Sequence, residues 1–340
     1  MVIAYANYLA ENNEVVIYTN INKTHFPISS KVKIRQIPYK GKIGTIMWSI
    51  LNKIETDIVI ADIIILAVVL SIRNRNKVVY FAQDYDVSYY KDKIRQFLIK
   101  MVYFFGLRLL NIPCIAVSQT LKRELEIYKK DITVVPNGID FKTFYPEPDE
   151  DLLKEKKNKK AVVIFSRKDP RKGTDIALKV LSHLSYHISK NELIVWVVGE
   201  KIKNDILPYE VKNFGFVEEN RLREILSSAD VFLYPSRHEG MPLFVLESLA
   251  CNCPVVTTKA VGNLGNLPGV FVSNINEHED IVKNLLNVLQ SKVFIKRDVL
   301  LSKFDLEKQK KEFKKRLFEI VTKLRENLYF WKILVLKFYI

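Results

Sequence analysis

Two glutamates that bracket an apolar segment are the first feature of this sequence with chemical potential. Residues 236–256 read SRHEGMPLFVLESLACNCPVV, with Glu239 and Glu247 eight positions apart. Pro242 suits the first turn of a helix, where its missing N–H costs nothing. Asn252 fits the left-handed position that ends many helices. We therefore expect Glu239 in the loop before a short helix and Glu247 more than one turn inside it.

The start of this helix offers an anion site between the two carboxylates. Eight residues at helical rise span about 12 Å, which is the scale of a nucleoside diphosphate with a sugar attached. Free backbone N–H groups near Met241 and Leu243 would attract anions, whereas carboxylates accept hydrogen bonds from hydroxyls. The layout therefore suggests phosphate in the middle and a polyol at each end.

The elements that must position these residues follow an alternating pattern. Strand-like apolar runs separated by helical stretches occur at 14–19, 31–37, 57–62, 77–83, 114–118 and 132–136. Continuous apolar strands of this kind indicate a parallel sheet that is covered on both faces.

A break in the pattern predicts a domain boundary. The Pro-rich and Asn-Gly-containing stretch 136–148 is followed by the charged segment 149–160, DEDLLKEKKNKK, which we interpret as a linker. Strand-like and helical runs then resume. We predict α/β domains at 1–148 and 161–304, followed by a helix and an apolar tail at 305–340. Because ligands of such sheets bind at the carboxyl ends of strands, the cleft between the domains is the expected site.

Five segments together carry a family resemblance. Residues 239–247, EGMPLFVLE, resemble the E-x7-E element of the retaining glycosyltransferases of family 4, which have the GT-B architecture of two Rossmann-like domains. Further segments resemble other blocks of that family in the same order, and the likeness covers most of residues 75–290. These segments are 116–125, 134–140, 165–173 and 214–236.

The resemblance implies a role for each matching residue. Arg167 and Lys172 would hold the diphosphate of a nucleotide-sugar donor. Glu247 would bind the ribose hydroxyls and the backbone near Val217 the base, while Glu239 would hold the sugar hydroxyls near the reacting carbon. The rest of the predicted donor site is formed by Gly240, Met241 and Leu243.

The predicted chemistry uses no metal and no cofactor. One arginine, one lysine and a helix dipole can stabilise charge on a departing diphosphate. Pro242 departs from the family, which often has glycine there, and removes one backbone donor to the phosphate. A purely structural interpretation stays open. In it, Arg167 and Lys172 are solvated residues at the start of a helix, and the two glutamates are a helix cap and a surface residue. His238 is interpreted as a structural neighbour rather than a base.

The acceptor side is expected on residues 1–148. Residues 81–90, FAQDYDVSYY, follow a strand and resemble a segment that faces the acceptor in some family members. Asp84 is the candidate for orienting the acceptor hydroxyl, and an aspartate in a simple turn is the alternative. Asp84 and Asp86 also spell the Asp-x-Asp that binds metal in the other major glycosyltransferase fold, but nothing else in the sequence supports that fold.

Composition narrows the class of partner. The 340 residues carry a formal net charge of +15 and are 48% hydrophobic. Such a charge favours anionic partners or reflects solubility alone. A nucleic-acid partner is not expected, because no basic stripe with interleaved aromatics is present. Cys251 and Cys253 are expected to be small buried residues, and the odd count of three cysteines without a signal peptide indicates a reducing cytosol.

Membrane contact is a second open question. No apolar run reaches the ~20 residues of a membrane span. Residues 97–110, FLIKMVYFFGLRLL, have eleven apolar or aromatic residues in fourteen. A buried helix is the favoured interpretation, and insertion at the inner face of a membrane is the alternative. The aromatic tail at 329–340 is expected to cover the N-terminal domain or to touch a membrane.

The start of the chain predicts a gap. In the family, the helix and strand of residues 1–19 are the second and third elements, so a first strand and its glycine-rich loop are missing. We expect an unpaired gap at the centre of the N-terminal sheet, filled in a longer protein by ~15–25 further residues. A truncated, non-catalytic partner that binds nucleotide sugar is the alternative function, and an epimerase fits the motifs less well.

Overall fold

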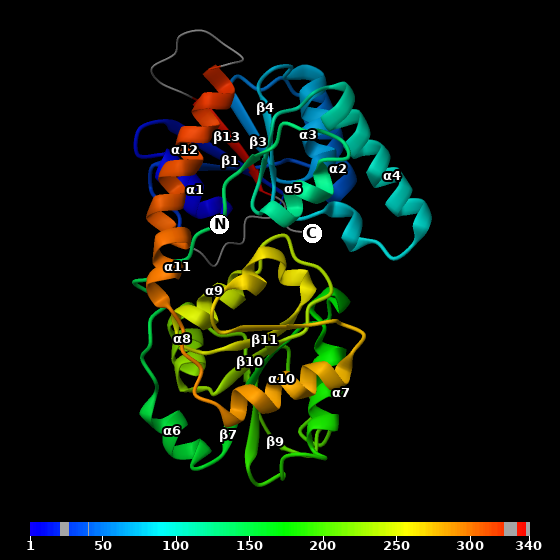
Figure 1. Cartoon of the computed structure of the whole chain (residues 1–340). Helices are drawn as coiled ribbons and strands as arrows, with labels where there is room; N and C mark the ends of the chain where they lie inside the picture. Colours follow the sequence, from blue (N-terminus) through cyan, green and yellow to red (C-terminus); the bar gives the residue numbers. More distant parts are fainter. Residues whose placement is uncertain (21–26, 40, 323–331, 338–340) are drawn as a thin grey trace. The chain divides into compact units, whose positions relative to one another are not determined.

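The computed structural model describes residues 1–20, 27–39, 41–322 and 332–337 and divides into two α/β units (Figure 1). Unit 1 comprises Met1–Gly138 and Glu307–Ile340, and unit 2 comprises Ile139–Leu306. Each unit contains one parallel sheet with helices packed on it, as the alternating pattern predicts. No helix in the described ranges is long and apolar enough to cross a membrane.

Unit 1 is built on a seven-stranded parallel sheet of order β2-β1-β13-β3-β4-β5-β6. The six strands predicted in this half of the sequence all form, because β-branched and aromatic runs favour buried extended backbone. The strands are β1 (Glu14–Thr19), β2 (Val32–Gln36), β3 (Ile58–Ala61), β4 (Val78–Ala82), β5 (Cys114–Ala116), β6 (Thr133–Val134) and β13 (Lys332–Lys337).

Helices from both ends of the chain pack on this sheet. Phe313 of α12 lies against Tyr5 of α1 and Phe81 of β4, with ring centroids 4.4 and 4.8 Å apart. The helices are α1 (Val2–Leu9), α2 (Gly41–Leu51), α3 (Ile64–Arg73), η1 (Asp86–Tyr89), α4 (Lys93–Tyr103), the π-helical η2 (Phe104–Leu109), α5 (Gln119–Leu125) and α12 (Leu306–Thr322).

The predicted gap in the unit 1 sheet is absent, because strand β13 occupies its centre. The C-terminal residues Lys332–Lys337 pair in parallel with β1 on one side and β3 on the other (Figure 1). Leu334 lies opposite Val16 and Val59 and is 1% exposed. The expectation of an unpaired centre was therefore wrong. The tail at 329–340 was expected to cover the N-terminal domain or to touch a membrane, but its residues 332–337 instead form a strand inside the unit 1 sheet. Residues 329–331 and 338–340 lie outside the described part.

Unit 2 is built on a six-stranded parallel sheet of order β12-β11-β10-β7-β8-β9. The strands are β7 (Lys160–Ser166), β8 (Leu193–Gly199), β9 (Glu210–Gly215), β10 (Val231–Tyr234), β11 (Val255–Thr258) and β12 (Val270–Ser273). The helical elements are α6 (Glu150–Lys156), η3 (Pro170–Lys172), α7 (Thr174–Leu184), α8 (Glu219–Ser228), α9 (Leu243–Ala250), η4 (Lys259–Asn266), α10 (His278–Gln290) and α11 (Arg297–Phe304).

Alternation along the strands of unit 2 creates two cores. Val162 and Ile164 of β7 pack with residues of α7 and α10, whereas Val163 and Phe165 pack with residues of α8 and α9. The sheet is therefore buried on both faces, as its continuous apolar strands predict. Cys251 and Cys253 are buried free cysteines in one of these cores.

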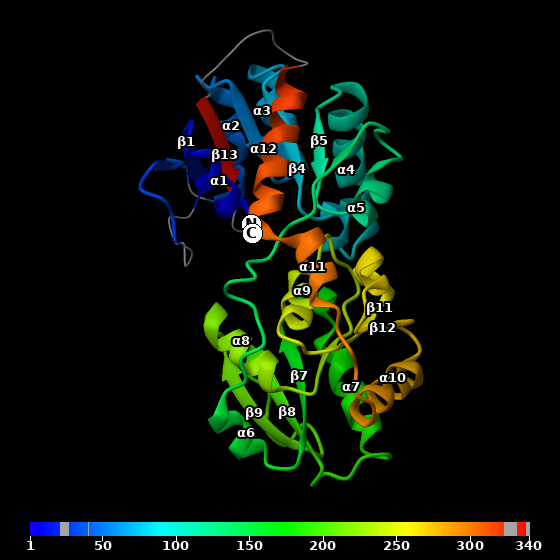
Figure 2. The same ribbon diagram turned by 60° about the vertical axis from the view of Figure 1, so that its left-hand side comes forward.

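The boundary between the units differs from the predicted one. Unit 2 begins at Ile139, and the segment interpreted as a linker forms α6, which lies beside α8 (Figure 2). Asp149 caps α6 by accepting a hydrogen bond from the Leu152 amide at 2.8 Å, and Leu152 is 1% exposed. Lys156 pairs with Asp230 at 2.9 Å. A single buried leucine and these polar contacts attach a segment whose composition resembles a linker.

Candidate active site

A glycine in the left-handed conformation places the loop after β7 against the end of β10. Gly173 has φ +71°, and a Cβ there would lie 1.9 Å from the carbonyl oxygen of Pro235. Only glycine fits this position, since any side chain would clash with backbone. The contact is closed by backbone as well, because the Arg237 amide donates to the Arg171 carbonyl at 2.7 Å. Lys172 is thereby held next to the segment that follows β10.

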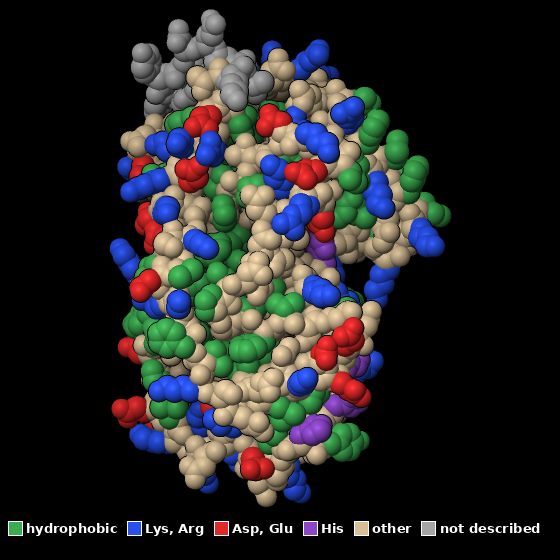
Figure 3. Space-filling view, in the orientation of Figure 1, with side chains coloured by type: hydrophobic (Ala, Val, Ile, Leu, Met, Phe, Trp, Pro, Cys, Tyr) green, Lys and Arg blue, Asp and Glu red, His purple; other side chains and the backbone are tan. Residues whose placement is uncertain are grey.

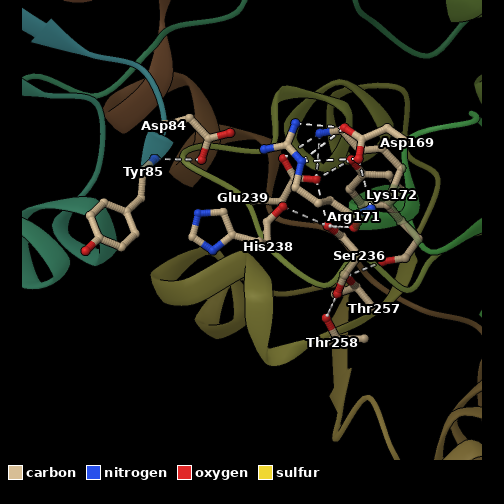
Figure 4. A network of polar contacts seen from close by, with 11 residues as sticks. Asp84, Tyr85, Asp169, Arg171, Lys172, Ser236, His238, Glu239, Thr257 and Thr258 are labelled. Atoms are coloured by element: carbon tan, nitrogen blue, oxygen red, sulfur yellow. Dashed lines mark hydrogen bonds and ion pairs between the residues drawn. The ribbon is translucent and has the colours of Figure 1, made fainter. Parts of the chain in front are cut away.

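The carboxylate of Glu239 is the centre of a polar network (Figure 4). Its two oxygens lie 2.9 and 3.0 Å from Lys172 Nζ. One oxygen also accepts hydrogen bonds from the Tyr234 hydroxyl at 2.5 Å and from Ser236 Oγ at 2.7 Å. Glu239 is 7% exposed. The network therefore fixes the orientation of a buried carboxylate beside one cation.

Tyr234 acts as a hydrogen-bond donor in this network. Burial, followed by the charge of Glu239 and their hydrogen bond, raises the pKa of Tyr234 well above its ordinary value. A phenol with a raised pKa stays protonated at neutral pH and donates to the carboxylate. Glu239 is neither a helix cap nor a surface residue, so the structural alternative for this glutamate is wrong.

Arg167 lies at the carboxyl end of β7, where the sequence places it. Its guanidinium stacks over the rings of Phe165 and Phe216, with 4.4 and 4.5 Å to the ring centroids. Burial lowers the pKa of Arg167 from its ordinary value. Thr174 fixes the backbone, because its hydroxyl accepts from the Arg167 amide at 3.0 Å. Arg167 is thus a partly buried cation between aromatic rings rather than a solvated helix start.

Two further arginines of this region were not predicted. Arg171 forms a fork-like pair with Asp169, with the shortest contact at 2.7 Å, and Arg237 pairs with Asp175 through two contacts of 2.7 Å. Burial alone would raise the pKa of Asp169, but the hydrogen bonds and charge of Arg171 lower it. The basic run RKDPRKG could have indicated Arg171 as a site residue. Its pairing with Asp169 could not be predicted, because it depends on the 3₁₀ turn η3 between them.

Helix α9 begins one residue later than predicted. Pro242 is the N-cap, with φ −79° and ψ 92°, and the helix runs from Leu243 to Ala250. The left-handed Asn252 after it is confirmed, with φ +62°. The first amides of a helix have no partner within it. The N–H groups of Leu243 and Phe244 therefore lie at the start of α9, where the predicted anion site is located.

Glu247 lies more than one turn inside α9, as predicted, in a largely buried environment. Burial, followed by the charge of Glu219, raises the pKa of Glu247 to about 8. Its Oε2 atom has no hydrogen-bond partner among the described residues. At neutral pH a carboxyl group with this pKa keeps its proton, so Glu247 can both donate a hydrogen bond to a hydroxyl and accept one from it.

The loop after β9 contains the remaining predicted donor-site residue. Val217 packs on the unit 2 core, while Phe216 beside it is 68% exposed. Phe216 also covers Arg167. The loop therefore contacts the same cation that the sequence assigns to the diphosphate.

Unit 1 presents a different set of groups at the carboxyl edge of its sheet. Gln83 and Asp84 follow β4, and Asn137 follows β6 and donates from Nδ2 to Gln83 Oε1 at 3.2 Å. Gln83 Nε2 is buried without a partner among the described residues. Asp84 Oδ1 accepts from the Tyr85 amide at 2.8 Å. These groups are neutral amides and one carboxylate, which suit hydroxyl partners.

The two aspartates of the Asp-x-Asp at 84–86 accept hydrogen bonds from backbone amides. Asp86 is buried and accepts a hydrogen bond from the Ile64 amide at the start of α3, at 3.0 Å. Among the described residues, no group of three or more His, Cys, Asp or Glu side chains is placed to hold a metal ion.

The structure thus brings Lys172 and Glu239 into direct contact, with Arg167 on the same loop. Gly240, Met241 and Leu243 follow Glu239 toward Glu247 on α9. Asp84 belongs to unit 1, whereas the other predicted site residues belong to unit 2.

The chain contains two α/β units, each built on one parallel sheet, and the second has charged groups at its strand ends. This is the construction of the GT-B glycosyltransferase fold. The sucrose-phosphate synthase of Thermosynechococcus elongatus superposes with a TM-score of 0.73 at 16% identity, over 94% of this chain and 92% of that one. This likeness confirms the predicted fold class of two Rossmann-like domains.

Residues 147–300 match the model of the glycosyl transferases group 1. A phosphatidylinositol N-acetylglucosaminyltransferase GPI3 subunit of Saccharomyces cerevisiae (strain YJM789) is 26% identical over 196 residues, 52% of this chain and 43% of that protein. A UDP-Gal:alpha-D-GlcNAc-diphosphoundecaprenol alpha-1,3-galactosyltransferase of Escherichia coli is 28% identical over 191 residues, 50% of this chain and 48% of that protein. The chain thus spans less than half the length of either relative.

Proposed function

We propose that this protein is a retaining glycosyltransferase that moves a sugar from a nucleotide-sugar donor to a glycan, lipid-linked or polysaccharide acceptor. The observation that carries the proposal is the buried Glu239 carboxylate held by Lys172, Tyr234 and Ser236 within a glycosyl transferases group 1 domain. A carboxylate and an ammonium side by side at a strand end can receive the two parts of a sugar nucleotide.

In the proposed reaction, the bond between the sugar C1 and the diphosphate oxygen breaks and negative charge develops on the diphosphate. The acceptor hydroxyl oxygen bonds to C1, and its proton passes to the departing diphosphate. Lys172, Arg167 and the amides at the start of α9 stabilise that charge without a metal. Lys172 turns partly from Glu239 toward the phosphate, so that Glu239 accepts hydrogen bonds from the sugar hydroxyls. Glu247 binds the ribose, and the backbone near Val217 holds the base.

The acceptor docks on unit 1 in this proposal, where Asp84 orients the reacting hydroxyl. The unpaired Gln83 donor and the neighbouring Asn137 supply further contacts to hydroxyls. Both relatives described above are named for lipid-borne substrates, phosphatidylinositol and diphosphoundecaprenol. A lipid-linked acceptor and a location at the cytoplasmic face of a membrane are therefore the preferred choice.

The donor is identified by thermal shift with UDP, GDP, dTDP and ADP sugars, since a ligand that binds the native state raises its stability. With the stabilising donor, Lys172→Ala should weaken donor binding by about tenfold or more, because a charge-assisted hydrogen bond is lost. Glu239→Gln should reduce kcat by about 10²-fold and change donor affinity less, since its contact strengthens in the transition state.

Lys179→Ala is the matched control, because this lysine is exposed on α7 beyond the network. Wild-type kinetics in Lys172→Ala and Glu239→Gln would contradict the assignment. Transfer should also persist in excess EDTA. Loss that manganese restores would return the Asp-x-Asp at 84–86 as a metal site.

A non-catalytic partner that binds nucleotide sugar is the second candidate, favoured by the subunit name of the yeast relative. Product analysis with a labelled donor separates the two functions. Label in an acceptor supports the transferase, whereas binding without transfer for any donor and acceptor pair supports the partner.

A further inference from the structure

Helix α4 and the π-helical turn η2 expose an unusual amount of apolar surface. Figure 3 shows hydrophobic side chains gathered along the outer edge of unit 1, where Figure 1 draws α4. Ile94 is 74% exposed and Phe97 61% exposed. The favoured sequence interpretation of a buried helix was therefore wrong. The exposed apolar residues of this surface, the α4 face, are Ile94, Phe97, Leu98, Met101, Phe104, Phe105, Leu109 and Leu110.

The spacing of these residues defines one side of a helix. With about 100° between successive residues, the exposed apolar residues of α4, from Ile94 to Met101, fall within an arc of about 100°. Tyr103, which is fully buried, lies on the opposite side and attaches the helix to unit 1. The helix is thus packed by one side and presents an apolar stripe on the other.

Basic residues border this stripe on both sides. Lys93 and Lys100 fall beside one edge of the arc and Arg95 beside the other, and all three are exposed. Residues 91–111 hold five basic residues, Lys91, Lys93, Arg95, Lys100 and Arg108, against the single acid Asp92. Asp92 caps α4 and pairs with Arg95 at 3.2 Å.

We propose that the α4 face docks on an anionic lipid surface. An apolar stripe with basic borders is the pattern that inserts at a membrane interface, with the cations at the headgroups. The charge argues against a second copy of this chain as the occupant, because pairing two identical faces would bring like charges together.

The inner side of α4 connects this face with the candidate acceptor segment. The hydroxyl of Tyr103 accepts from the Asp86 amide at 3.0 Å and lies 3.0 Å from the Tyr80 hydroxyl. Its ring stacks on Tyr128, whose hydroxyl lies 2.9 Å from that of Tyr85. Docking of α4 therefore places the 84–89 segment, with Asp84, about one helix diameter (~10 Å) from the lipid surface, an inference that rests on the proposed function.

The docking is tested by sedimentation with vesicles of phosphatidylcholine alone and with phosphatidylglycerol added. We expect binding to the anionic vesicles only. We expect Phe97→Ser/Leu98→Ser to weaken binding by about tenfold or more, because apolar surface that would insert is lost. We expect a similar loss for Lys93→Gln/Lys100→Gln, because two charges near the surface are removed. Phe294→Ser is the matched control, because Phe294 is 79% exposed in unit 2 and its replacement should leave binding unchanged.

Equal binding of wild type and variants, or no binding to anionic vesicles, would overturn the proposal. Light scattering tests whether a second copy of the chain occupies the face. A dimer of the wild type that is absent in Phe97→Ser/Leu98→Ser would assign the face to a second copy and overturn the lipid proposal. Vesicle binding requires no catalysis. Vesicle binding without any sugar transfer would therefore refute the proposed function and support the docking surface. Sugar transfer without vesicle binding would support the proposed function and refute the docking surface.

The link through Tyr103 has its own readout. Tyr103→Phe removes the hydroxyl that holds the Asp86 amide and leaves the α4 face intact. We expect unchanged vesicle binding, an unchanged KM for the donor and a raised KM for a lipid-borne acceptor. A variant with unaltered acceptor kinetics would limit the proposal to docking alone and remove its acceptor part.

Discussion

The two sheets of this protein have the same parallel construction but differ at their carboxyl edges. In unit 2 that edge carries paired charges, with Lys172 against Glu239 and Arg171 against Asp169. In unit 1 it carries the amides of Gln83 and Asn137, with Asp84 beside them. The same fold thus presents an electrostatically organised edge in one unit and a nearly neutral, hydroxyl-compatible edge in the other. Under the proposed function, this division matches a charged donor and an uncharged acceptor group.

The units also differ in how the chain builds them. Unit 2 is one continuous segment, Ile139–Leu306, whereas unit 1 combines Met1–Gly138 with the segment that starts at Glu307. Its central strand β13 is distant in sequence from both of its neighbours. Unit 1 therefore depends on a long-range pairing that unit 2 does not need.

The largest expected effect tests this dependence. Leu334→Asp places a carboxylate in the fully buried centre of the unit 1 sheet and should cost more than ~4 kcal/mol. Hydrogen exchange read by mass spectrometry should show loss of protection in unit 1 with unit 2 retained. Lys332→Gln, at the exposed start of β13, is the control. Equal loss of protection in both units would contradict the independence of the two folds.

A second substitution acts on unit 2 alone. Gly173→Ala should destabilise it by about 2–4 kcal/mol, because the new Cβ meets the Pro235 carbonyl as well as a left-handed backbone. Gly215→Ala is the control, since Gly215 has φ +74° but open space around its Cβ. It should cost only ~1 kcal/mol. Similar urea midpoints for the two variants would mean that the close approach to Pro235 carries no cost.

The pH dependence of stability sharpens the electrostatic contrast. The folded protein holds a proton on Glu247 up to a pKa of about 8, above the ordinary 4.5. The neutral form is fully stabilising below pH 4.5, and this contribution is lost as the pH rises through 8. Unit 2 should lose ~1–2 kcal/mol between pH 6 and 8, less than the full linkage value because Glu247 is not completely buried. Glu247→Gln should flatten this slope in thermal melts.

The smallest effect is expected at the surface. Arg237→Gln breaks the ion pair with Asp175, whose side chains are 37% and 54% exposed. Exposed pairs contribute less than ~1 kcal/mol, so the urea midpoint should hardly move. A large loss would show that the backbone contacts between the 167–173 loop and the end of β10 depend on this pair.

The sequence predicts strands better than it predicts boundaries and surfaces. Val162–Ile164 and Val231–Tyr234 form strands because local apolar runs determine them, and the E-x7-E spacing correctly locates Glu239 and Glu247 around the start of α9. Periodicity alone does not say which side of a helix is covered, so 97–110 was interpreted as buried. The placement of β13 depends on a partner strand more than 300 residues away, and no local pattern reports that pairing.

The position of β13 sets an order for folding during synthesis. All of unit 2 is translated before Lys332, so its sheet can be complete while β1 and β3 still lack the strand between them. Non-local pairings of this kind form late, because chain closure must precede the contacts that reward it. During that interval two apolar strand edges are open and prone to pairing with other chains. The nascent chain is therefore exposed to such mispairing until β13 has left the ribosome.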